Sequence, residues 1–219
     1  MTALALVLTA LALPAPGGFS ARVTNPYFPL RPGMRWVYRG VDEGKRQRNV
    51  VDVTDRVVVV AGAPCAVIHD RVFLDGHLAE ETLDYYSQDA RGTVWYFGED
   101  THTLDSHGRV ISTEGSWRAG VDGARQGIYM PPHPRVGQRF QQEHYPGHAE
   151  DRFKVLGRHA SVQTPFRDFR RRALLTEEWT PLEPGVRDRK WYVRGIGQVR
   201  EASAKGPRER ADLVSFQRR

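Results

Sequence analysis

The regular recurrence of strand-like segments between turn residues constrains this chain more than any other feature. Residues 50–60 are rich in valine, and β-branched side chains favour strands over helices. The Asp75-Gly76 pair is typical of a tight hairpin turn between two strands. Beyond an apolar run at the N-terminus, no segment has the apolar period of an amphipathic helix. The sequence therefore predicts an all-β chain.

The spacing of these segments also predicts how the strands are arranged. We expect about ten to twelve antiparallel strands in a meander, forming a curled sheet or an incomplete barrel. Residues 115–137 are rich in Gly and Pro and interrupt the pattern, so we expect an irregular segment whose part 118–137 is the natural lid of a pocket. The expected strands cover residues 34–39, 50–60, 65–74, 77–87, 93–97, 109–112, 138–144, 149–159, 171–179, 186–193, 198–204 and 210–216.

The N-terminus predicts the location of the protein. Residues 3–13 are apolar almost without interruption, and a stretch rich in Pro and Gly follows. A run of this length matches the apolar core of a secretory signal peptide and is too short to cross a bilayer. No Lys or Arg precedes it, so the signal is atypical, and a buried N-terminal helix is the alternative. We expect a signal peptide in residues 1–22, a single all-β domain in residues 23–219, no transmembrane segment, and a secreted, periplasmic or cell-envelope location.

The formal net charge of +6 belongs to the second half of the chain. Residues 1–110 carry a net charge of −2, whereas residues 111–219 carry +8. Arginines cluster only at residues 167–172 and near the C-terminus, and a solvated basic face is the commoner cause of such runs than a nucleic-acid site. We therefore expect no nucleic-acid partner. Peripheral contact with an anionic polymer or membrane surface remains one hypothesis for the function.

Three stretches of the chain resemble uncharacterised exported bacterial proteins. They are residues 25–38, which open with N-P-Y-F-P-L, residues 95–101, and residues 191–199 with the pattern W-Y-x-x-G-x-G-x-V. The last stretch looks like the strand–turn–strand of several families of unknown function. The resemblance implies a curled antiparallel sheet similar to calycins or to lipoprotein-carrier half-barrels. It implies no catalytic residues.

Large aromatic side chains are frequent in the expected strands. Such rings either fill the core or line a pocket for a lipid-like or other small apolar ligand, and a half-barrel can accommodate both. Our leading hypothesis is a non-enzymatic protein that binds an apolar or amphipathic ligand in the concave face of the sheet, and we predict no cofactor. The candidate ligand-binding residues are Trp36, Tyr38, Trp95, Phe97, Glu99, Asp100 and Glu114.

Carboxylates near the ends of the expected strands suggest an alternative function. Paired carboxylates act as general acid and base, or as acid and nucleophile, in glycoside hydrolysis. On this alternative, Glu99, Glu114 or Glu143 would serve a hydrolase that acts on an envelope polysaccharide. The same residues could instead hold calcium, or simply be solvated near turns.

Three histidines are candidate metal ligands. His144 and His148 flank the Pro146-Gly147 turn, and His133 lies eleven residues before His144. Imidazole is a common ligand of zinc and copper, and a hairpin could bring two of these rings together. The alternative is that they are exposed turn histidines.

Overall fold

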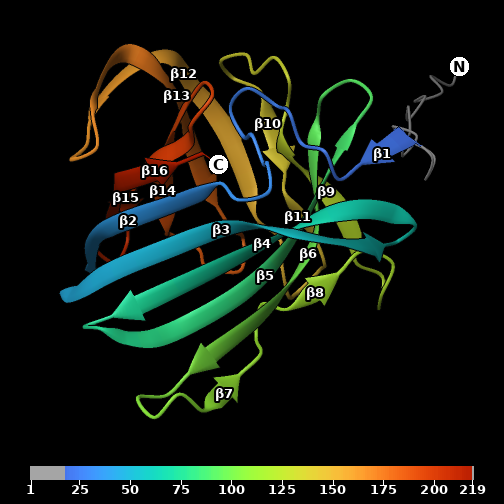
Figure 1. Ribbon diagram of the computed structural model, residues 1–219, viewed down its shortest axis with the longest axis horizontal. Coiled ribbons are helices and arrows are strands. Elements are labelled where there is room, and N and C mark those ends of the chain that lie inside the picture. Colours follow the sequence, from blue (N-terminus) through green and yellow to red (C-terminus); the bar gives the residue numbers. More distant parts are fainter. Residues whose placement is uncertain (1–17, 219) are drawn as a thin grey trace, which may run out of the picture.

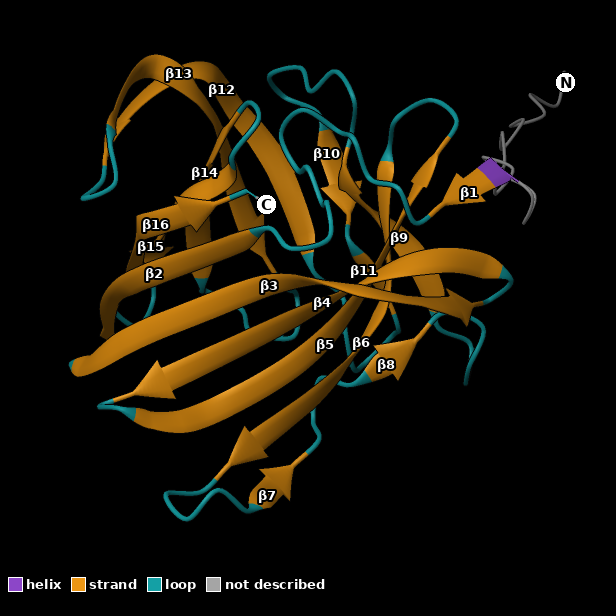
Figure 2. Ribbon diagram, viewed as in Figure 1, coloured by secondary structure: helices purple, strands orange, loops and turns teal. Residues whose placement is uncertain are grey.

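The fold is one large antiparallel sheet. The computed structural model describes residues 18–218, and within them strands joined by turns and loops make up the fold (Figure 1, Figure 2). This part of the chain contains no helix that is both long and apolar enough to span a membrane. The sixteen strands of this part are β1 (Phe19–Ser20), β2 (Arg35–Asp42), β3 (Lys45–Val60), β4 (Ala63–Leu74), β5 (His77–Asp89), β6 (Val94–Leu104), β7 (Val110–Ser112), β8 (Trp117–Arg118), β9 (Arg125–Met130), β10 (Arg139–Gln141), β11 (Glu143–His144), β12 (Arg152–Gln163), β13 (Asp168–Trp179), β14 (Arg187–Val193), β15 (Gly197–Lys205) and β16 (Glu209–Gln217).

The sheet curls until its two ends nearly meet. Its strand order is β10-β12-β13-β14-β15-β16-β2-β3-β4-β5-β6-β9-β11, with β1 paired to β5 and both β7 and β8 paired to β6. β10 and β11 lie at opposite ends of this order, yet only Gln142 separates them along the chain. Gly127 of β9 packs against this junction, where a Cβ atom would lie 2.1 Å from the carbonyl oxygen of Gln142. The result is an almost closed barrel whose closing contact requires a glycine.

The predicted all-β fold with a curled antiparallel sheet is therefore confirmed, although the strands are more numerous than predicted. Three of the additional strands are very short, since β1, β8 and β11 have two residues each. Segments of this length are too short for a period to be recognised. The stretch 115–137 also differs from its prediction, because β8 and β9 lie within it and both pair with β6. It forms part of the wall of the barrel.

Three hairpins share one turn geometry. The pairs Glu43-Gly44, Ala61-Gly62 and Asp75-Gly76 have positive φ angles at both positions, between 46° and 92°. Two successive residues of this kind form a type I′ turn, whose twist matches that of the paired strands. The hairpin predicted at Asp75-Gly76 is confirmed, since Leu74 and His77 are register partners across it.

The segment before β2 connects distant parts of the sheet. The buried Asn25 donates its side-chain N–H to the carbonyl oxygen of Gly92, in the turn between β5 and β6, at 3.0 Å. Next to it, the carbonyl oxygen of Pro26 accepts the backbone N–H of Gly195, in the turn between β14 and β15, at 2.6 Å. The indole N–H of Trp36 donates to the carbonyl oxygen of Ile196 at 2.7 Å. The first and last stretches noted in the sequence are thus neighbours in space.

Candidate functional site

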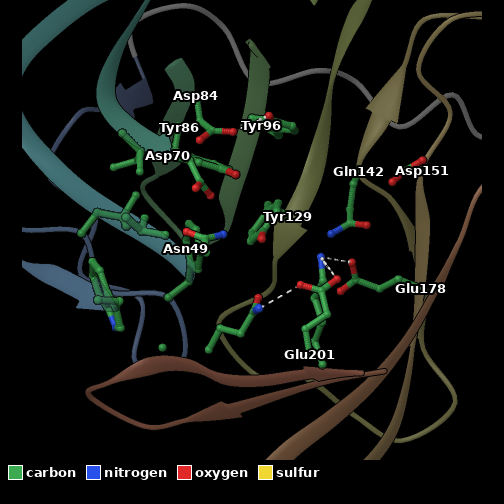
Figure 3. A pocket seen from close by; sticks show the side chains of 18 of the residues that line it. Asn49, Asp70, Asp84, Tyr86, Tyr96, Tyr129, Gln142, Asp151, Glu178 and Glu201 are labelled. Carbon is green, nitrogen blue, oxygen red and sulfur yellow. Dashed lines mark hydrogen bonds and ion pairs between the residues drawn. The ribbon is translucent and has the colours of Figure 1, made fainter. Parts of the chain in front are cut away.

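The concave side of the sheet encloses a cavity of about 260 Å³ (Figure 3). Its walls come from β2 to β6 on one side and from β13 to β15 on the other, while Tyr129 of β9, Asp151 and residues 28–30 and 142–143 complete the lining. Aromatic, aliphatic and ionisable side chains all face it. The ionisable ones are Asp70, Asp84, Glu143, Asp151, Glu178, Lys190 and Glu201.

The wall formed by β3, β4 and β5 presents polar oxygen atoms to the cavity. Asp70 is opposite Val51 in the β3–β4 register, and Asp84 is opposite Ile68 in the β4–β5 register. Opposed residues and residues two apart share one face of a sheet, so Asn49, Asp70 and Asp84 lie on the same face. Burial, together with the nearby Asp84, raises the pKa of Asp70 well above its ordinary value. The Oδ1 atoms of Asn49 and Asp70 are buried and have no hydrogen-bond partner among the described residues.

Asp84 and Glu99 both contact one tyrosine hydroxyl. The Tyr96 hydroxyl lies 2.6 Å from Asp84 Oδ1 and 2.9 Å from Glu99 Oε2. The hydroxyl has a single hydrogen, so it can donate to only one of the two carboxyl groups. The other contact needs a proton on the carboxyl itself. Burial raises the pKa of Asp84 to about 6 and, with the nearby Asp84, raises that of Glu99 well above its ordinary value, so the trio holds an extra proton at neutral pH.

A second pair of carboxyl groups lies where the ends of the sheet meet. The backbone N–H of Asp151 donates to Glu143 Oε2 at 3.4 Å, and the backbone N–H of Gln142 donates to the carbonyl oxygen of Asp151 at 2.7 Å. Burial and the nearby Asp151 raise the pKa of Glu143 to about 8. Burial also raises the pKa of Asp151. The junction that closes the barrel therefore places two more carboxyl groups on the cavity.

Lys190 is the only basic side chain that lines the described cavity. Its Nζ lies 2.8 Å from Glu178 Oε2 and 3.4 Å from Glu201 Oε1. Burial alone would lower the pKa of Lys190, but Glu178 and Glu201 raise it well above its ordinary value, so the side chain stays charged. The Tyr192 hydroxyl donates to the other oxygen of Glu178 at 3.3 Å. Lys190 is thus already paired, and it leaves the remaining carboxyl groups without a compensating cation.

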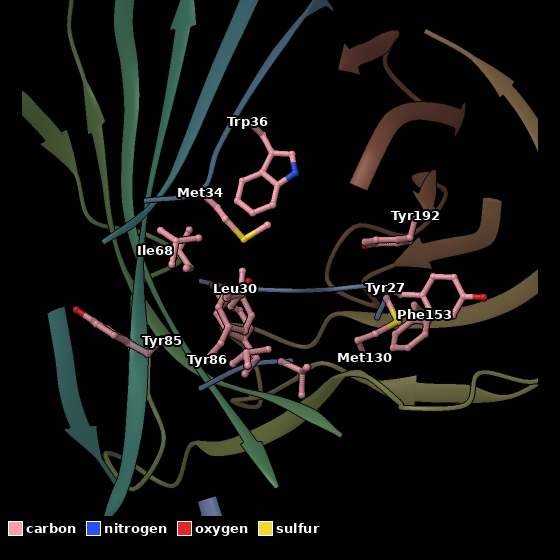
Figure 4. Packing of buried hydrophobic residues seen from close by; sticks show 14 of the residues in the cluster. Tyr27, Leu30, Met34, Trp36, Ile68, Tyr85, Tyr86, Met130, Phe153 and Tyr192 are labelled. Carbon is pink, nitrogen blue, oxygen red and sulfur yellow. The ribbon is translucent and has the colours of Figure 1, made fainter. Parts of the chain in front are cut away.

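Aromatic and aliphatic side chains complete the lining. Trp36 and Tyr38 are two residues apart on β2 and both face the cavity. Tyr86 and Tyr96 stack with ring centroids 4.6 Å apart, at an angle of 14°. Figure 4 shows Trp36 and Tyr86 among the buried residues that surround them. The same rings therefore pack the core and border the cavity.

The predicted ligand-binding residues lie in three different places. Trp36 and Tyr38 line the cavity. Glu99 lies beside it and contacts the hydroxyl of Tyr96, which is a lining residue. Trp95 and Phe97 instead pack against Phe19 of β1, with ring centroids 6.1 and 5.0 Å away, and do not line the cavity.

Asp100 and Glu114 also lie apart from the cavity lining. Asp100 pairs with Arg118 at 2.5 Å and accepts a hydrogen bond from the Tyr85 hydroxyl at 2.7 Å. Glu114 is exposed on the loop between β7 and β8. Of the carboxylates proposed for a hydrolase, the structure thus brings together only Glu99 and Glu143.

The predicted metal ligands do not line the cavity either. His148 stacks on Tyr145 with centroids 4.3 Å apart, and His133 lies in the loop after β9. Burial, with help from the nearby Arg125, lowers the pKa of His144. Within residues 18–218, no group of three His, Cys, Asp or Glu side chains is placed to hold a metal ion.

Sequence reasoning missed most of the ionisable lining. Asp70 follows the apolar run 65–68, and Lys190 and Glu178 lie in the middle of expected strands. A charged residue within a strand whose pattern predicts burial indicates a paired or functional site, because charged residues are rarely buried unless they are paired. The inward direction of these side chains, however, depends on which face becomes concave.

Comparisons with known proteins show the fold. No family model and no curated protein matches the chain. A solved structure from Bacteroides fragilis, described as a "putative exported protein with YmcC-like fold", is 13% identical with a TM-score of 0.51, covering 88% of this chain and 99% of that one. A "putative lipoprotein" from Parabacteroides distasonis is 11% identical with a TM-score of 0.49, over the same shares. At such low identity the first likeness concerns the fold alone. The likeness to calycins remains a prediction.

Proposed function

We propose that this protein is an exported binding protein that holds a small amphipathic ligand in the cavity of its curled sheet. One observation carries the proposal: the same enclosed space is bordered by aromatic rings such as Trp36 and Tyr86 and by a set of carboxyl groups. Ligand sites are typically concave, mainly apolar, and carry a few polar groups that fix orientation. The cavity has both kinds of lining.

The chemistry of the lining favours an amphipathic ligand over a purely apolar one. An apolar molecule beside Asn49 and Asp70 would leave their buried Oδ1 atoms without water or a partner, at a cost of about 1–3 kcal/mol for each unsatisfied group. A ligand with one polar end avoids that cost. Its apolar part would lie against Trp36, Leu30 and Ile68, which border the same space.

Export is the second part of the proposal. It is supported by the apolar N-terminal run, which lies outside the described residues, and by the description of the Bacteroides fragilis protein as exported. Residues 1–17 of the predicted signal peptide are not described. Phe19 and Ser20 are, and they pair with β5. We therefore place the cleavage before Phe19, earlier than the boundary after residue 22 expected from the sequence.

The binding proposal is tested by native mass spectrometry of the full chain, before and after organic extraction. Val51 lines the cavity on β3, and Val57 is 58% exposed on the same strand. We expect an extractable small molecule on the wild-type protein, less of it on Val51→Phe, and the wild-type amount on Val57→Phe. A protein that is always empty and binds no member of a diverse library of small amphiphiles would contradict the proposal.

A hydrolase remains the second candidate, because one specific pair of carboxyl groups fits it. Asp84 and Glu99 contact the same Tyr96 oxygen, so their carboxyl oxygens lie within about 5.5 Å of each other, near the separation in retaining glycosidases. Hydrolysis of aryl glycosides that is abolished in Asp84→Asn but kept in Asp100→Asn would support this candidate. Equal rates for the wild type and Asp84→Asn would exclude it.

The anionic-surface hypothesis also gains a specific location. The hairpin of β12 and β13 carries five exposed arginines and one exposed aspartate, Asp168, near its tip. This surface is separate from the cavity lining, so docking and ligand binding could both occur. The exposed arginines of the hairpin are Arg158, Arg167, Arg170, Arg171 and Arg172.

A further inference from the structure

The cavity has an excess of acidic groups that nothing in the described chain balances. Six carboxyl groups line it, Glu99 lies beside it, and Lys190 is the one basic side chain of the lining. Lys190 is already paired with Glu178 and Glu201. Carboxyl groups so close together in a poorly hydrated space repel each other when ionised. The charge that is missing from this cavity is positive.

The missing charge is concentrated on the wall of β3, β4 and β5. Asp70 and Asp84 lie on that wall within the β4–β5 register, and Asn49 is beside Asp70 (Figure 3). The nearest cation of the lining, Lys190, comes from β14 in the opposite half of the barrel. No ion pair to Asp70 or Asp84 is present among the described residues.

Two acceptor atoms on this wall also lack a hydrogen-bond donor. Asn49 Oδ1 and Asp70 Oδ1 are buried acceptors without a partner in the described chain, and buried acceptors of this kind are rare in folded proteins. A group that satisfies them must carry N–H or O–H bonds. Asp84 already receives one short hydrogen bond from Tyr96 and has a second oxygen to offer.

Aromatic rings border the same cavity. Tyr86 and Trp36 both line it, and Tyr86 comes from β5, the strand that carries Asp84. The face of an aromatic ring attracts a cation within about 6 Å of its centre. Carboxyl groups and ring faces around one small space are together suited to an organic cation with an apolar body.

We propose that the ligand carries a primary ammonium or guanidinium group, which binds against Asp70, Asn49 and Asp84 while its apolar part lies against Trp36 and Tyr86. This inference rests on the proposed binding function and specifies the class of ligand. A quaternary ammonium group supplies the charge but no N–H donor. A neutral alcohol supplies a donor but no charge. An inorganic cation has no ligand set here, since the described residues form no group of three suited to a metal.

Binding of such a cation should release protons. In the empty cavity, protons on Asp70 and on the Asp84–Glu99 pair take the place of a compensating charge, since burial raises the pKa of all three groups. A bound ammonium group stabilises the ionised form of a neighbouring carboxyl group and lowers its pKa. The proton it displaces passes to the buffer, so the heat of binding depends on the ionisation enthalpy of the buffer.

The experiment compares three probes of one shape by isothermal titration calorimetry on the full chain. They are phenethylamine, its trimethylammonium analogue and 2-phenylethanol, each titrated at neutral pH in two buffers of different ionisation enthalpy. We expect the amine to bind at least tenfold more tightly than the other two and to release protons. Asp70→Asn should reduce the affinity for the amine about tenfold and leave the affinity for the alcohol unchanged. Asp100→Asn, which removes a carboxyl group paired outside the lining, should change neither.

The possible results separate this inference from the proposed function. If the alcohol binds as tightly as the amine, the cation site is wrong and the amphipathic cavity stands. If the trimethylammonium analogue binds as tightly as the amine, N–H donation to Asn49 and Asp70 is wrong. If no probe binds at millimolar concentration, the cavity is not a site for ligands of this size, and both proposals fail. If Asp70→Asn does not fold, the relative affinities of the three probes for the wild-type chain are sufficient to test the cation site.

Discussion

Lys190 and Glu178 form an ion pair of 2.8 Å inside the barrel, across the neighbouring strands β14 and β13. The exposed fractions of the two side chains are 19% and 8%, so little solvent screens the pair. Glu201 of β15 lies 3.4 Å from the same Nζ. The lysine therefore holds two carboxylates, on the strands to either side of its own, on the wall opposite Asp70.

Removal of this lysine should destabilise the fold. Lys190→Met leaves Glu178 and Glu201 as unpaired charges in the barrel, and loss of one partner of a buried pair costs about 3–5 kcal/mol. We expect a loss of this order in the free energy of unfolding, measured by urea denaturation at neutral pH. Lys205→Met, at an exposed position of β15, is the control and should change it by less than about 0.5 kcal/mol. Equal stability of the two variants would show that the pair contributes nothing.

Stability should fall as the pH rises from about 5 to 8. The pKa values of Asp84, about 6, and Glu143, about 8, lie above those of unfolded chains, so the folded state holds more protons than the unfolded state in this range. Each such group lowers the free energy of unfolding by up to about 1.4 kcal/mol per pH unit. This loss accrues between the pKa of the group in the unfolded chain and its higher pKa in the folded state. The other charged groups that line the cavity are Asp70, Asp151, Glu178, Lys190 and Glu201, and Glu99 lies beside it.

The measurement is the thermal midpoint across this pH range. Glu143→Gln should flatten the dependence, because it removes the carboxyl group at the junction of the sheet whose pKa is raised to about 8. Glu183→Gln, on the exposed loop between β13 and β14, should leave the dependence as in the wild type. A stability that rises steadily to pH 8 would contradict the assignment of protons to these carboxyl groups.

A β-bulge at Gly98 explains why Glu99 reaches the hydroxyl of Tyr96, on the cavity side of β6, whereas Phe97 lies on the other side. Tyr96 pairs with Tyr86 and Glu99 with Asp84, so three steps along β6 match two along β5. The extra residue on β6 reverses the alternation of faces after Phe97. Gly98 has a φ of 129°, and a Cβ atom there would lie 2.1 Å from the carbonyl oxygen of Trp117.

Gly98→Ala should therefore disturb both stability and the Tyr96 pair. We expect a loss of about 1–3 kcal/mol or more in the free energy of unfolding, from backbone strain and the clash with Trp117. Gly157→Ala in β12 has open space around its Cβ position and is the matched control. If the two variants were equally stable by urea denaturation, the bulge would not depend on glycine.

How much of this site the sequence could predict is clear from β2 and β6. Trp36 and Tyr38 share the concave face, because alternation on β2 is unbroken from Arg35 to Tyr38 in its register with β3. The same reasoning places Trp95, Phe97 and Glu99 on one face of β6, and the bulge at Gly98 separates them. A single glycine in a strand indicates a bulge only when the partner register is known.

Most carboxyl groups of the cavity were missed for a different reason. Asp70, Asp84 and Glu178 lie far apart in the sequence, and only curling of the sheet brings them to one space. Composition and local pattern carry no information on that curvature. The turn at Asp75-Gly76, by contrast, depends only on two adjacent residues, and the sequence was sufficient for it.

Removal of residues up to 22 should weaken the fold, because Phe19 belongs to it. Its ring lies edge-on to Trp95 and Phe97, and Ser20 pairs with Gln88 on β5. Aromatic pairs contribute about 0.5–1.5 kcal/mol each beyond the burial of their area. We expect a chain that starts at residue 23 to be about 1–3 kcal/mol less stable than one that starts at residue 18, by urea denaturation. Equal stability would move the start of the folded chain to Val23.

The basic hairpin leads to the last prediction, which concerns anionic surfaces. Arg158 and Arg172 are exposed on β12 and β13, and each arginine near an anionic membrane surface contributes about 1 kcal/mol to binding. Vesicles that contain anionic lipid should bind the protein at low ionic strength and release it as salt is added. The double variant Arg158→Glu/Arg172→Glu should bind at least tenfold more weakly.

The control for this prediction changes the same number of charges elsewhere. Arg39→Glu/Arg91→Glu places two reversals on β2 and on the turn between β5 and β6, away from the hairpin. If both double variants lose affinity equally, the attraction comes from the net charge of the molecule, because total charge acts on association at long range. If only the hairpin variant loses it, the hairpin is the docking surface. Binding that is unchanged from low to high salt would exclude an electrostatic partner for these arginines.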